Sequence, residues 1–377
     1  MKVLHVSKFY PPVFGGIETV AWELVEGLNQ SGVHTDVLCS HQQLRGVAER
    51  WPGGYRVRRA GSLGMVLSTS MAASMPWYLA QMSRQADIVH LHMPDPTAAA
   101  AFWMARPRAK LVVQWHSDVI RQRLALKLYG PLQHWLLARA DAVVATSPPY
   151  AQTSQALQAW RHKVHVVPIG ISDNRGAAQR QTAERLRQRM GGRRLVFALG
   201  RMTYYKGFEV LIDAAAALPD NCAVMIGGDG EWLGRIKALV ARRGLADKVH
   251  LLGHIADDAL ASHFEACDVF CMPSTVRAEA YGVAMLEAML MCKPVVASDI
   301  AGTGVPWVNQ HGVSGLNVPA GDPVALAGAL NQLLADEGLR AELGRGARLR
   351  YEQDFSATRM TERTLALYRQ LLPHDNA

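Results

Sequence analysis

Two carboxylates in the second half of the chain have a spacing that suits a hydroxylated ligand. Glu279 and Glu287 are eight residues apart, and Gly282 between them precedes a helical pattern. Eight residues span a little over two helical turns, so Glu287 is expected on the helix face that points back toward the loop of Glu279. The helix N-terminus offers free N–H groups to a phosphate, and carboxylates accept hydrogen bonds from hydroxyls. The pattern predicts a sugar nucleotide site, with amides for the diphosphate, Glu279 for the sugar and Glu287 for the ribose.

Two cations lie on one loop upstream of these carboxylates. Arg201 and Lys206 follow the apolar run 195–199 and precede a helical pattern, which indicates a strand, a loop and a helix. Open α/β sheets bind ligands at the carboxyl ends of their strands. Because positive charge stabilises a departing diphosphate, the loop is expected to bind one.

The first half has its own candidates at expected strand ends. Gly15 and Gly16 precede an expected helix over 19–30, and adjacent glycines allow close approach of a ligand. His92 and Asp95 follow one apolar run and are candidates for contact with an acceptor, as is Glu18. His90, His92 and His134 are expected to be structural by default, and contact with the acceptor is the alternative for His92.

Taken together, these motifs resemble glycosyltransferase family 4, the retaining transferases of the GT-B fold. The resemblance is carried by Glu-x7-Glu at 279–287, Lys-Pro-Val-Val-Ala-Ser at 293–298, the Gly-Arg and Lys-Gly pairs within 200–207, and the glycine-rich turns at 227–231 and 252–255. It covers nearly the whole chain and is strongest over 195–320.

The resemblance implies roles for particular residues. Catalytic roles fall to His116, Arg201, Lys206 and Glu279, with His116 hydrogen-bonded to the donor sugar and the two cations holding the diphosphate. Donor-binding roles fall to Gly15, Gly16, Gly253, His254, Ile255, Tyr281, Gly282, Val283 and Glu287, and backbone groups at 253–255 are expected to read the base.

The expected fold class is α/β, with two Rossmann-like domains that face each other across a deep cleft and a C-terminal helix that crosses back to the first domain. Apolar runs alternate with helical patterns in both halves, as doubly wound sheets require. The expected parts are an acceptor-binding domain over 1–170, a linker with a short helix over 171–193, a nucleotide-sugar domain over 194–354 and the closing helix over 355–377.

The donor is favoured rather than fixed. Where many family members have Gly-Gly-Ile-Pro-Glu, this chain has Ala301 to Trp307 without the glutamate. Residues 302–309 and 311–316 look most like transferases of bacterial surface polysaccharide assembly, several of which add mannose. GDP-mannose is therefore preferred as donor, and a polyprenyl-linked saccharide or other glycan as acceptor. The alternatives are a UDP-sugar transferase, a sugar nucleotide 2-epimerase of the same fold and a non-catalytic sugar-nucleotide-binding subunit.

The resemblance also implies a mechanism. No motif supplies a carboxylate nucleophile, so front-face displacement with retention is expected, and the leaving phosphate takes the acceptor proton. The chain contains no Asp-x-Asp, so neither a metal nor another cofactor is expected.

The excess of positive charge is confined to the first half of the chain. Residues 1–172 hold 17 Lys and Arg against 9 Asp and Glu, whereas residues 173–377 hold 23 against 23. Such an excess suits an anionic surface. The uncharged run 60–83, flanked by arginines, is expected to form a helix lying in a membrane interface, and 121–129 is a second basic and apolar stretch; a core helix with a solvated edge is the alternative for both. Nucleic acid is disfavoured, because no basic run is interleaved with aromatic residues.

The location of the protein follows from these features. Five scattered cysteines indicate a reducing compartment, and the first residues read as a strand rather than a signal peptide. The protein is therefore expected in the cytoplasm, peripheral on the inner face of the cytoplasmic membrane.

Overall fold

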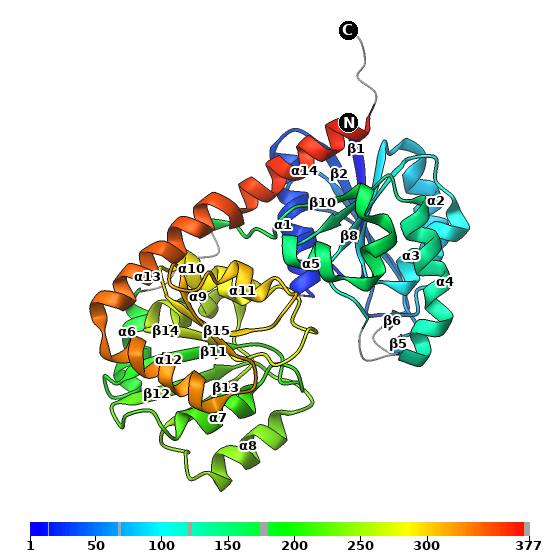
Figure 1. The fold of residues 1–377 in the computed structure, drawn as a ribbon. Helices are drawn as coiled ribbons and strands as arrows, with labels where there is room; N and C mark the ends of the chain where they lie inside the picture. The colour runs from blue at the N-terminus through cyan, green and yellow to red at the C-terminus, as the bar shows by residue number, and fades with distance from the viewer. Residues whose placement is uncertain (14, 67–68, 120–122, 174–179, 373–377) are drawn as a thin grey trace. The chain divides into compact units, whose positions relative to one another are not determined.

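The computed structural model describes residues 1–13, 15–66, 69–119, 123–173 and 180–372. The chain forms two compact units (Figure 1). The first contains Met1–Gly170 together with the residues from Ala357 onward, and the second is Ile171–Ser356. Each unit is built around one mainly parallel sheet with helices on its faces, so the α/β class expected from the alternating pattern is confirmed.

The sheet of the first unit has the strand order β10-β9-β8-β7-β1-β2-β4-β3. All neighbouring strands are parallel except β3, which is antiparallel to β4 at the edge. The order reverses direction between β1 and β7, and such switch points are where open α/β sheets bind ligands. The strands are β1 Lys2–Ser7, β2 His34–Ser40, β3 Val47–Arg50, β4 Arg56–Ala60, β7 Ile88–Met93, β8 Lys110–Trp115, β9 Ala142–Ala145 and β10 Val164–Val166.

The closing helix of the chain packs on the first unit (Figure 1). This helix, α14 (Ala357–Leu371), contacts α1 (Gly16–Gln30). A Cβ at Gly27 would lie 2.1 Å from Thr361 Oγ1, so a glycine is what lets the two helices approach. The expected return of the last helix to the first domain is thereby confirmed. The unit's other helices are α2 Met75–Met82, α3 Pro96–Ala105, α4 Arg123–Arg139 and α5 Pro148–Thr153.

The second unit is a six-stranded parallel sheet with the order β13-β12-β11-β14-β15-β16. Its switch point lies between β11 and β14. Helices cover the strands, and strands buried on both faces are nearly continuous apolar runs. The strands are β11 Arg194–Leu199, β12 Cys222–Gly227, β13 Val249–Gly253, β14 Val269–Met272, β15 Val295–Asp299 and β16 Gly315–Pro319; the helices are α6 Arg180–Arg189, α7 Phe208–Ala215, α8 Leu233–Arg242, α9 Asp257–Ala266, α10 Val283–Leu290, α11 Val305–Val308, α12 Pro323–Ala335 and α13 Glu337–Arg350.

The segment 171–193, expected to be a linker with a short helix, joins the second unit where it is described. Its helix α6 packs against α9. The unit begins and ends at one place, because Ile171 forms a β-bridge with Ser356 and the Tyr351 hydroxyl donates to the Ile171 carbonyl at 2.8 Å. The boundary between the units thus falls at Gly170 and again at Ser356.

The run 60–83 does not form the single helix expected of it. β4 ends at Ala60, β5 (Met65–Val66) and β6 (Thr69–Ser70) form a short antiparallel ladder, and α2 occupies only Met75–Met82. A Cβ at Gly61 would lie 1.9 Å from the Leu44 carbonyl oxygen, so the chain here is held close to a neighbouring segment rather than coiled. Among the described residues, no helix has both the length and the apolar character needed to cross a membrane. Of the stretch 121–129, residues 121–122 lie outside the described residues, and the rest is the start of α4.

Candidate functional site

The two loops that meet at the switch point of the second unit bring Lys206 and Glu279 together. Lys206 follows β11 and Glu279 follows β14, and Lys206 Nζ lies 2.6 Å from Glu279 Oε2. The Ser274 hydroxyl donates to the same carboxylate oxygen at 2.9 Å. The backbone also joins these loops, because the Thr275 N–H donates to the Tyr205 carbonyl at 2.9 Å. Two residues predicted from separate motifs therefore form one ion pair.

Two glycines make this meeting of loops possible. Gly207 has φ +67°, and a Cβ on it would lie 1.9 Å from the Pro273 carbonyl oxygen. Gly282 has φ +87°, and a Cβ on it would lie 2.6 Å from Met272 Sδ. Residues with a side chain rarely adopt this left-handed conformation, and at Gly207 the neighbouring backbone also leaves no room for a Cβ. The motif glycines are therefore needed for the close packing of loop on loop.

The ion pair is largely removed from solvent but stays charged. The Lys206 side chain is 14% exposed and that of Glu279 10%. Burial lowers the pKa of Lys206, but the charge and the hydrogen bond of Glu279, together with the charge of Tyr205, outweigh burial, so the pKa is raised. Arg201, on the same loop, is exposed and its charge acts in the opposite direction on Lys206. The two loops together thus place Arg201, Lys206 and Glu279 at the ligand-binding edge of the sheet.

The predicted phosphate seat lies beside this pair in the chain. Gly282 is the N-cap of α10, Val283 is the first residue of the helix and Glu287 lies in its second turn, half-buried. Tyr281 is buried, with its ring edge-on to that of Phe355 at 6.4 Å between centroids. The expected helix start at Gly282 is confirmed, which places the free amides of the first turn next to the loop that carries Glu279.

The residues expected to read the base lie at the same edge of the sheet. Gly253 ends β13, and its carbonyl accepts a hydrogen bond from the Gly228 N–H at 2.7 Å; the Gly200 N–H donates to the Gly227 carbonyl at 3.1 Å. These bonds join the carboxyl ends of β11, β12 and β13. His254 and Ile255 directly follow the end of β13. His254 is exposed and Ile255 is half-buried.

In the first unit, three candidate residues gather around its own switch point. Gly15 is the N-cap of α1, next to Gly16, and a Cβ on Gly15 would lie 2.5 Å from Glu18 Oε2. The Glu18 side chain therefore folds back over the glycine. Burial raises the pKa of Glu18, although its backbone hydrogen bond and the charge of Lys8 oppose the shift. A carboxyl with a raised pKa near the strand ends suits contact with neutral hydroxyls.

Asp95 is the most perturbed carboxyl at this edge. Its Oδ1 accepts from the N–H groups of Thr97 at 3.1 Å and Ala98 at 3.3 Å, which caps α3. Its Oδ2 is buried and has no hydrogen-bond partner among the described residues. Burial raises the pKa of Asp95 to about 6, partly offset by those backbone hydrogen bonds. The Tyr129 hydroxyl is likewise buried without a partner in the described part of the chain, and the charge of Asp95 helps burial to raise the pKa of Tyr129.

Tyr129 carries no motif, so sequence reasoning missed it as a neighbour of Asp95. Buried polar groups normally have partners. Two unpartnered groups within electrostatic reach of each other therefore mark a place where a hydroxylated ligand could complete the hydrogen bonding.

The predicted residue His116 is joined to other histidines. His116 Nε2 lies 3.0 Å from His92 Nδ1, and His92 Nε2 lies 3.0 Å from His5 Nδ1. Burial lowers the pKa of His116 to about 3, so its ring is neutral at pH 7. Both nitrogens of His92 are bonded to imidazoles and the residue is 1% exposed, which leaves no ring nitrogen for an acceptor. His92 therefore lies one layer behind His116, which agrees with its default expectation as a structural residue and not with the alternative of contact with the acceptor.

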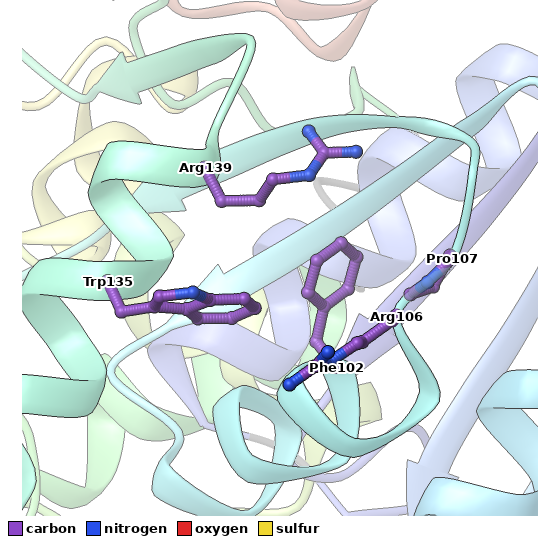
Figure 2. Close-up of a pocket in the computed structure, with 5 residues that line it drawn as sticks. All are labelled: Phe102, Arg106, Pro107, Trp135 and Arg139. Carbon is purple, nitrogen blue, oxygen red and sulfur yellow. The ribbon is translucent and has the colours of Figure 1, made fainter.

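A separate pocket of about 320 Å³ lies in the first unit (Figure 2). Phe102, Arg106, Pro107, Trp135 and Arg139 line it. Arg139 Nη1 pairs with Asp141 Oδ2 at 3.1 Å. The lining residues precede β8 and β9, so the pocket is at the amino edge of these strands, opposite to the edge of His116. No motif of the sequence pointed to it.

The fold is shared with solved enzymes of the GT-B class. Sucrose-phosphate synthase from Thermosynechococcus elongatus matches with a TM-score of 0.82 at 22% identity, covering 98% of each chain. HepE from Anabaena, solved in complex with UDP-glucose, matches with a TM-score of 0.80 at 23% identity, covering 98% of this chain and all of that one. The class of protein is thus a GT-B enzyme fold with two Rossmann-like units.

The family follows from the sequence comparisons. Residues 180–350 match the family described as glycosyl transferases group 1, and residues 15–170 match the glycosyl transferase 4-like domain. The O-antigen chain mannosyltransferase C of Escherichia coli is 33% identical over 376 residues, 99% of both chains. The D-rhamnosyltransferase WbpZ of Pseudomonas aeruginosa is 35% identical over 359 residues, 95% of this chain and 93% of that one. The chain belongs to the group 1 glycosyltransferases, and the protein is a glycosyltransferase.

Proposed function

We propose that this glycosyltransferase moves mannose from GDP-mannose to a growing, polyprenyl-linked surface polysaccharide, with retention at the anomeric carbon. The observation that carries the site is the Lys206–Glu279 ion pair at the switch point of the second unit. The name of the E. coli relative, which covers the full chain, supports mannose and O-antigen. The name of the P. aeruginosa relative favours one competitor, a D-rhamnosyl donor.

The proposed chemistry uses charges that are already in place. Lys206 and Arg201, with the amides after Gly282, bind the diphosphate, and Glu279 binds hydroxyls of the sugar. The bond from the anomeric carbon to the phosphate oxygen breaks while the acceptor oxygen bonds to the same face, and the acceptor proton passes to the departing phosphate. Two cations and helix amides stabilise the charge that develops, so turnover is proposed to need no metal and no other cofactor.

The first experiment is calorimetric titration of GDP and of UDP in the presence of EDTA. The wild type is expected to bind GDP selectively and Lys206→Ala to lose that binding. Lys248→Ala is the matched control, because the exposed fraction of its side chain, 15%, is similar to the 14% of Lys206. Its Nζ, however, contacts the Leu218 carbonyl at the opposite edge of the sheet. Selective binding of UDP would mean that the donor is a UDP-sugar and not GDP-mannose. Unchanged nucleotide binding by Lys206→Ala would reject the Lys206–Glu279 site.

Product analysis then tests the reaction. GDP-mannose and a GDP-activated D-rhamnose are each supplied with a polyprenyl-linked acceptor, and the anomeric configuration of the product is read by NMR. Retained configuration with mannose is expected. An inverted product would reject front-face displacement, and preference for rhamnose would assign the other donor. Conversion of the sugar nucleotide without acceptor would indicate an epimerase, and binding without nucleotide release a non-catalytic subunit.

We also propose that the first unit binds the anionic inner face of the cytoplasmic membrane. The packed helices α2 and α3 expose Trp77 (62%), Trp103 (47%) and Met104 (62%). Arginine is close to this apolar surface, because the Arg106 guanidinium lies 6.0 Å from the Trp103 ring centroid. Exposed aromatic residues with basic neighbours suit a lipid interface, and the excess of positive charge lies in the same half of the chain.

Sedimentation with vesicles tests the membrane proposal. The wild type is expected to bind vesicles rich in phosphatidylglycerol but not phosphatidylcholine, and the double variant Trp77→Ser, Trp103→Ser to bind several-fold less. Trp232→Ser, in the second unit beside Arg235, is the control. Equal binding by the wild type and the double variant would reject this surface.

A further inference from the structure

A buried chain of hydrogen bonds runs through the first unit from Gln114 in β8 to His116, the residue that follows β8. We call it the relay. Its members in order are Gln114, His90, Tyr368, His5, His92 and His116, and each has 6% exposure or less. They come from β1, β7, β8 and α14, so they meet only in the folded unit.

The distances along the relay are those of hydrogen bonds. From Gln114 Oε1 to His90 Nε2 the distance is 3.0 Å, and from His90 Nδ1 to the Tyr368 hydroxyl it is 2.5 Å. The Tyr368 hydroxyl lies 3.1 Å from His5 Nε2. The relay then passes through His92 to His116 at 3.0 Å for each step.

Burial keeps every imidazole of the relay neutral. It lowers the pKa of His90 and of His116 to about 3, and that of His5 and His92 well below its ordinary value. A neutral imidazole has one N–H donor and one acceptor nitrogen. Each ring between two partners must therefore donate on one side and accept on the other.

One oxygen sets the direction of the whole relay. Gln114 Oε1 can only accept, so His90 donates from Nε2 and accepts at Nδ1 from the Tyr368 O–H. The Tyr368 oxygen then accepts from His5 Nε2–H, and His5 Nδ1 accepts from His92 Nε2–H. His92 Nδ1 accepts from His116 Nε2–H. All four histidines are thus protonated at Nε2.

We propose that the Gln114 amide acts through the relay to hold His116 in its Nε2-protonated form, so that His116 Nδ1 is an acceptor for a hydroxyl of the donor sugar. His116 Nδ1 makes no hydrogen bond with the described residues. The tautomer follows from the geometry, whereas the role of Nδ1 rests on the function proposed above. Gln114, His90, Tyr368, His5 and His92 are then positioning residues, not groups that touch the substrate.

The same imidazoles could be taken for a metal site. Ligand atoms of His5, His90 and His92 lie within 4.8 Å of one another. All six of their ring nitrogens, however, already have hydrogen-bond partners in the relay. A metal ion would have to displace several of these bonds in a fully buried place, so the structure favours the relay.

NMR of ¹⁵N-histidine-labelled, ligand-free protein tests the tautomers directly. His5, His90, His92 and His116 are expected to show protonated Nε2 and unprotonated Nδ1. If the Gln114 amide had the opposite orientation, all four rings would be protonated at Nδ1 instead. Rings protonated at Nδ1 would therefore overturn the proposal. Addition of Zn²⁺ is expected to leave these resonances unchanged; their shift on binding would assign a metal site in place of the relay.

The variant Tyr368→Phe cuts the relay at its centre and separates a relay from simple packing. His90 is expected to remain Nε2-protonated, because it keeps Gln114, whereas His116 becomes a mixture of tautomers. Tyr351→Phe, which removes a buried tyrosine hydroxyl in the second unit, is the control and should change neither. A uniform His116 tautomer in a folded Tyr368→Phe variant would reject the coupling.

Transfer assays complete the test. Tyr368→Phe is expected to lower transfer roughly 3- to 10-fold, the effect of one impaired hydrogen bond, with GDP binding unchanged. If NMR shows the expected tautomers in the wild type and in Tyr368→Phe, but the variant transfers sugar as fast as the wild type, the role of His116 Nδ1 is rejected. If the wild type transfers no sugar at all, the proposed function fails, while the tautomers are still decided by NMR.

Discussion

The two units place different chemistry at equivalent points of the same topology. Both sheets reverse strand order at a switch point, between β1 and β7 in the first unit and between β11 and β14 in the second. The second unit has a charged pair there, Lys206 with Glu279. At the corresponding edge of the first unit lie a neutral imidazole, His116, and the carboxyl of Asp95, whose pKa is raised to about 6 by burial.

This difference follows from the partners that each edge has. In the second unit Gly207 lets the two loops pack closely, and contact with Glu279 helps to raise the pKa of Lys206 despite burial. In the first unit the imidazoles contact one another and an amide, so burial favours their neutral forms. A charged edge suits a diphosphate, and a neutral edge suits hydroxyls. The same topology therefore carries a charged edge in one unit and a neutral edge in the other.

The largest expected effect compares one residue from each edge. Lys206→Ala should lower kcat/KM for transfer roughly 100- to 1,000-fold, because it removes a charge that stabilises the departing diphosphate. His116→Ala should lower it by roughly 10-fold at most, because it removes one neutral hydrogen bond. Steady-state transfer assays on both variants measure the ratio, with Lys248→Ala as the unaffected control. Equal losses in the two variants would break the distinction between a charged and a neutral edge.

Acid should destabilise the first unit before the second. The unfolded histidines take up protons below pH 6.5, whereas burial holds the folded pKa of His90 and His116 to about 3. Stability is therefore present above pH 6.5 and is lost as the pH falls, by about 2 kcal/mol for each of these imidazoles at pH 5. Hydrogen exchange at pH 7.5 and pH 5, corrected for intrinsic rates, should show lost protection in β1, β7 and β8. Protection lost equally in β11 and β14 would contradict this.

The smallest expected effect tests whether the charge of Asp95 destabilises the folded first unit. Its pKa rises from an ordinary value of 3.8 to about 6 on folding, so the folded unit favours the protonated acid and loses stability as the pH rises through 6. Asp95→Asn keeps an oxygen to cap α3 and should stabilise the first unit by roughly 1–3 kcal/mol at pH 7.5. Hydrogen exchange of β7 and α3 in urea measures the gain.

That gain should shrink as the pH falls from 7.5 to 4, because the folded wild-type acid is then protonated and pH 4 is close to the ordinary pKa of 3.8, so most of the cost of the buried charge is removed. A gain that is the same at both pH values would mean that the charge of Asp95 is not destabilising the fold.

Sequence patterns predicted most of the strands and helices, because each buried strand of a parallel sheet is a short apolar run that can be recognised locally. Runs such as 195–199 and 269–272 are apolar where strands are buried on both faces, and both became strands. Gly282 marked the start of a helix for a local reason too, since a left-handed residue often flanks one. The prediction failed where the local signal was ambiguous: the uncharged run 60–83 was expected to be one helix, but it contains β5, β6 and α2, and Pro76 lies in the first turn of α2.

The sequence by itself determined the order of strands and helices, the residues at strand ends and the membership of the glycosyltransferase family, because each depends on short-range patterns. Only the tertiary structure decided which of those residues meet. Lys206 and Glu279 are 73 residues apart and His90 and Tyr368 are 278 apart, so neither pairing has a local signal. The tautomer of His116 has no local signal either, because it is set by the Gln114 amide, five hydrogen bonds away along the relay. The relay exists only when β1, β7, β8 and α14 are packed together.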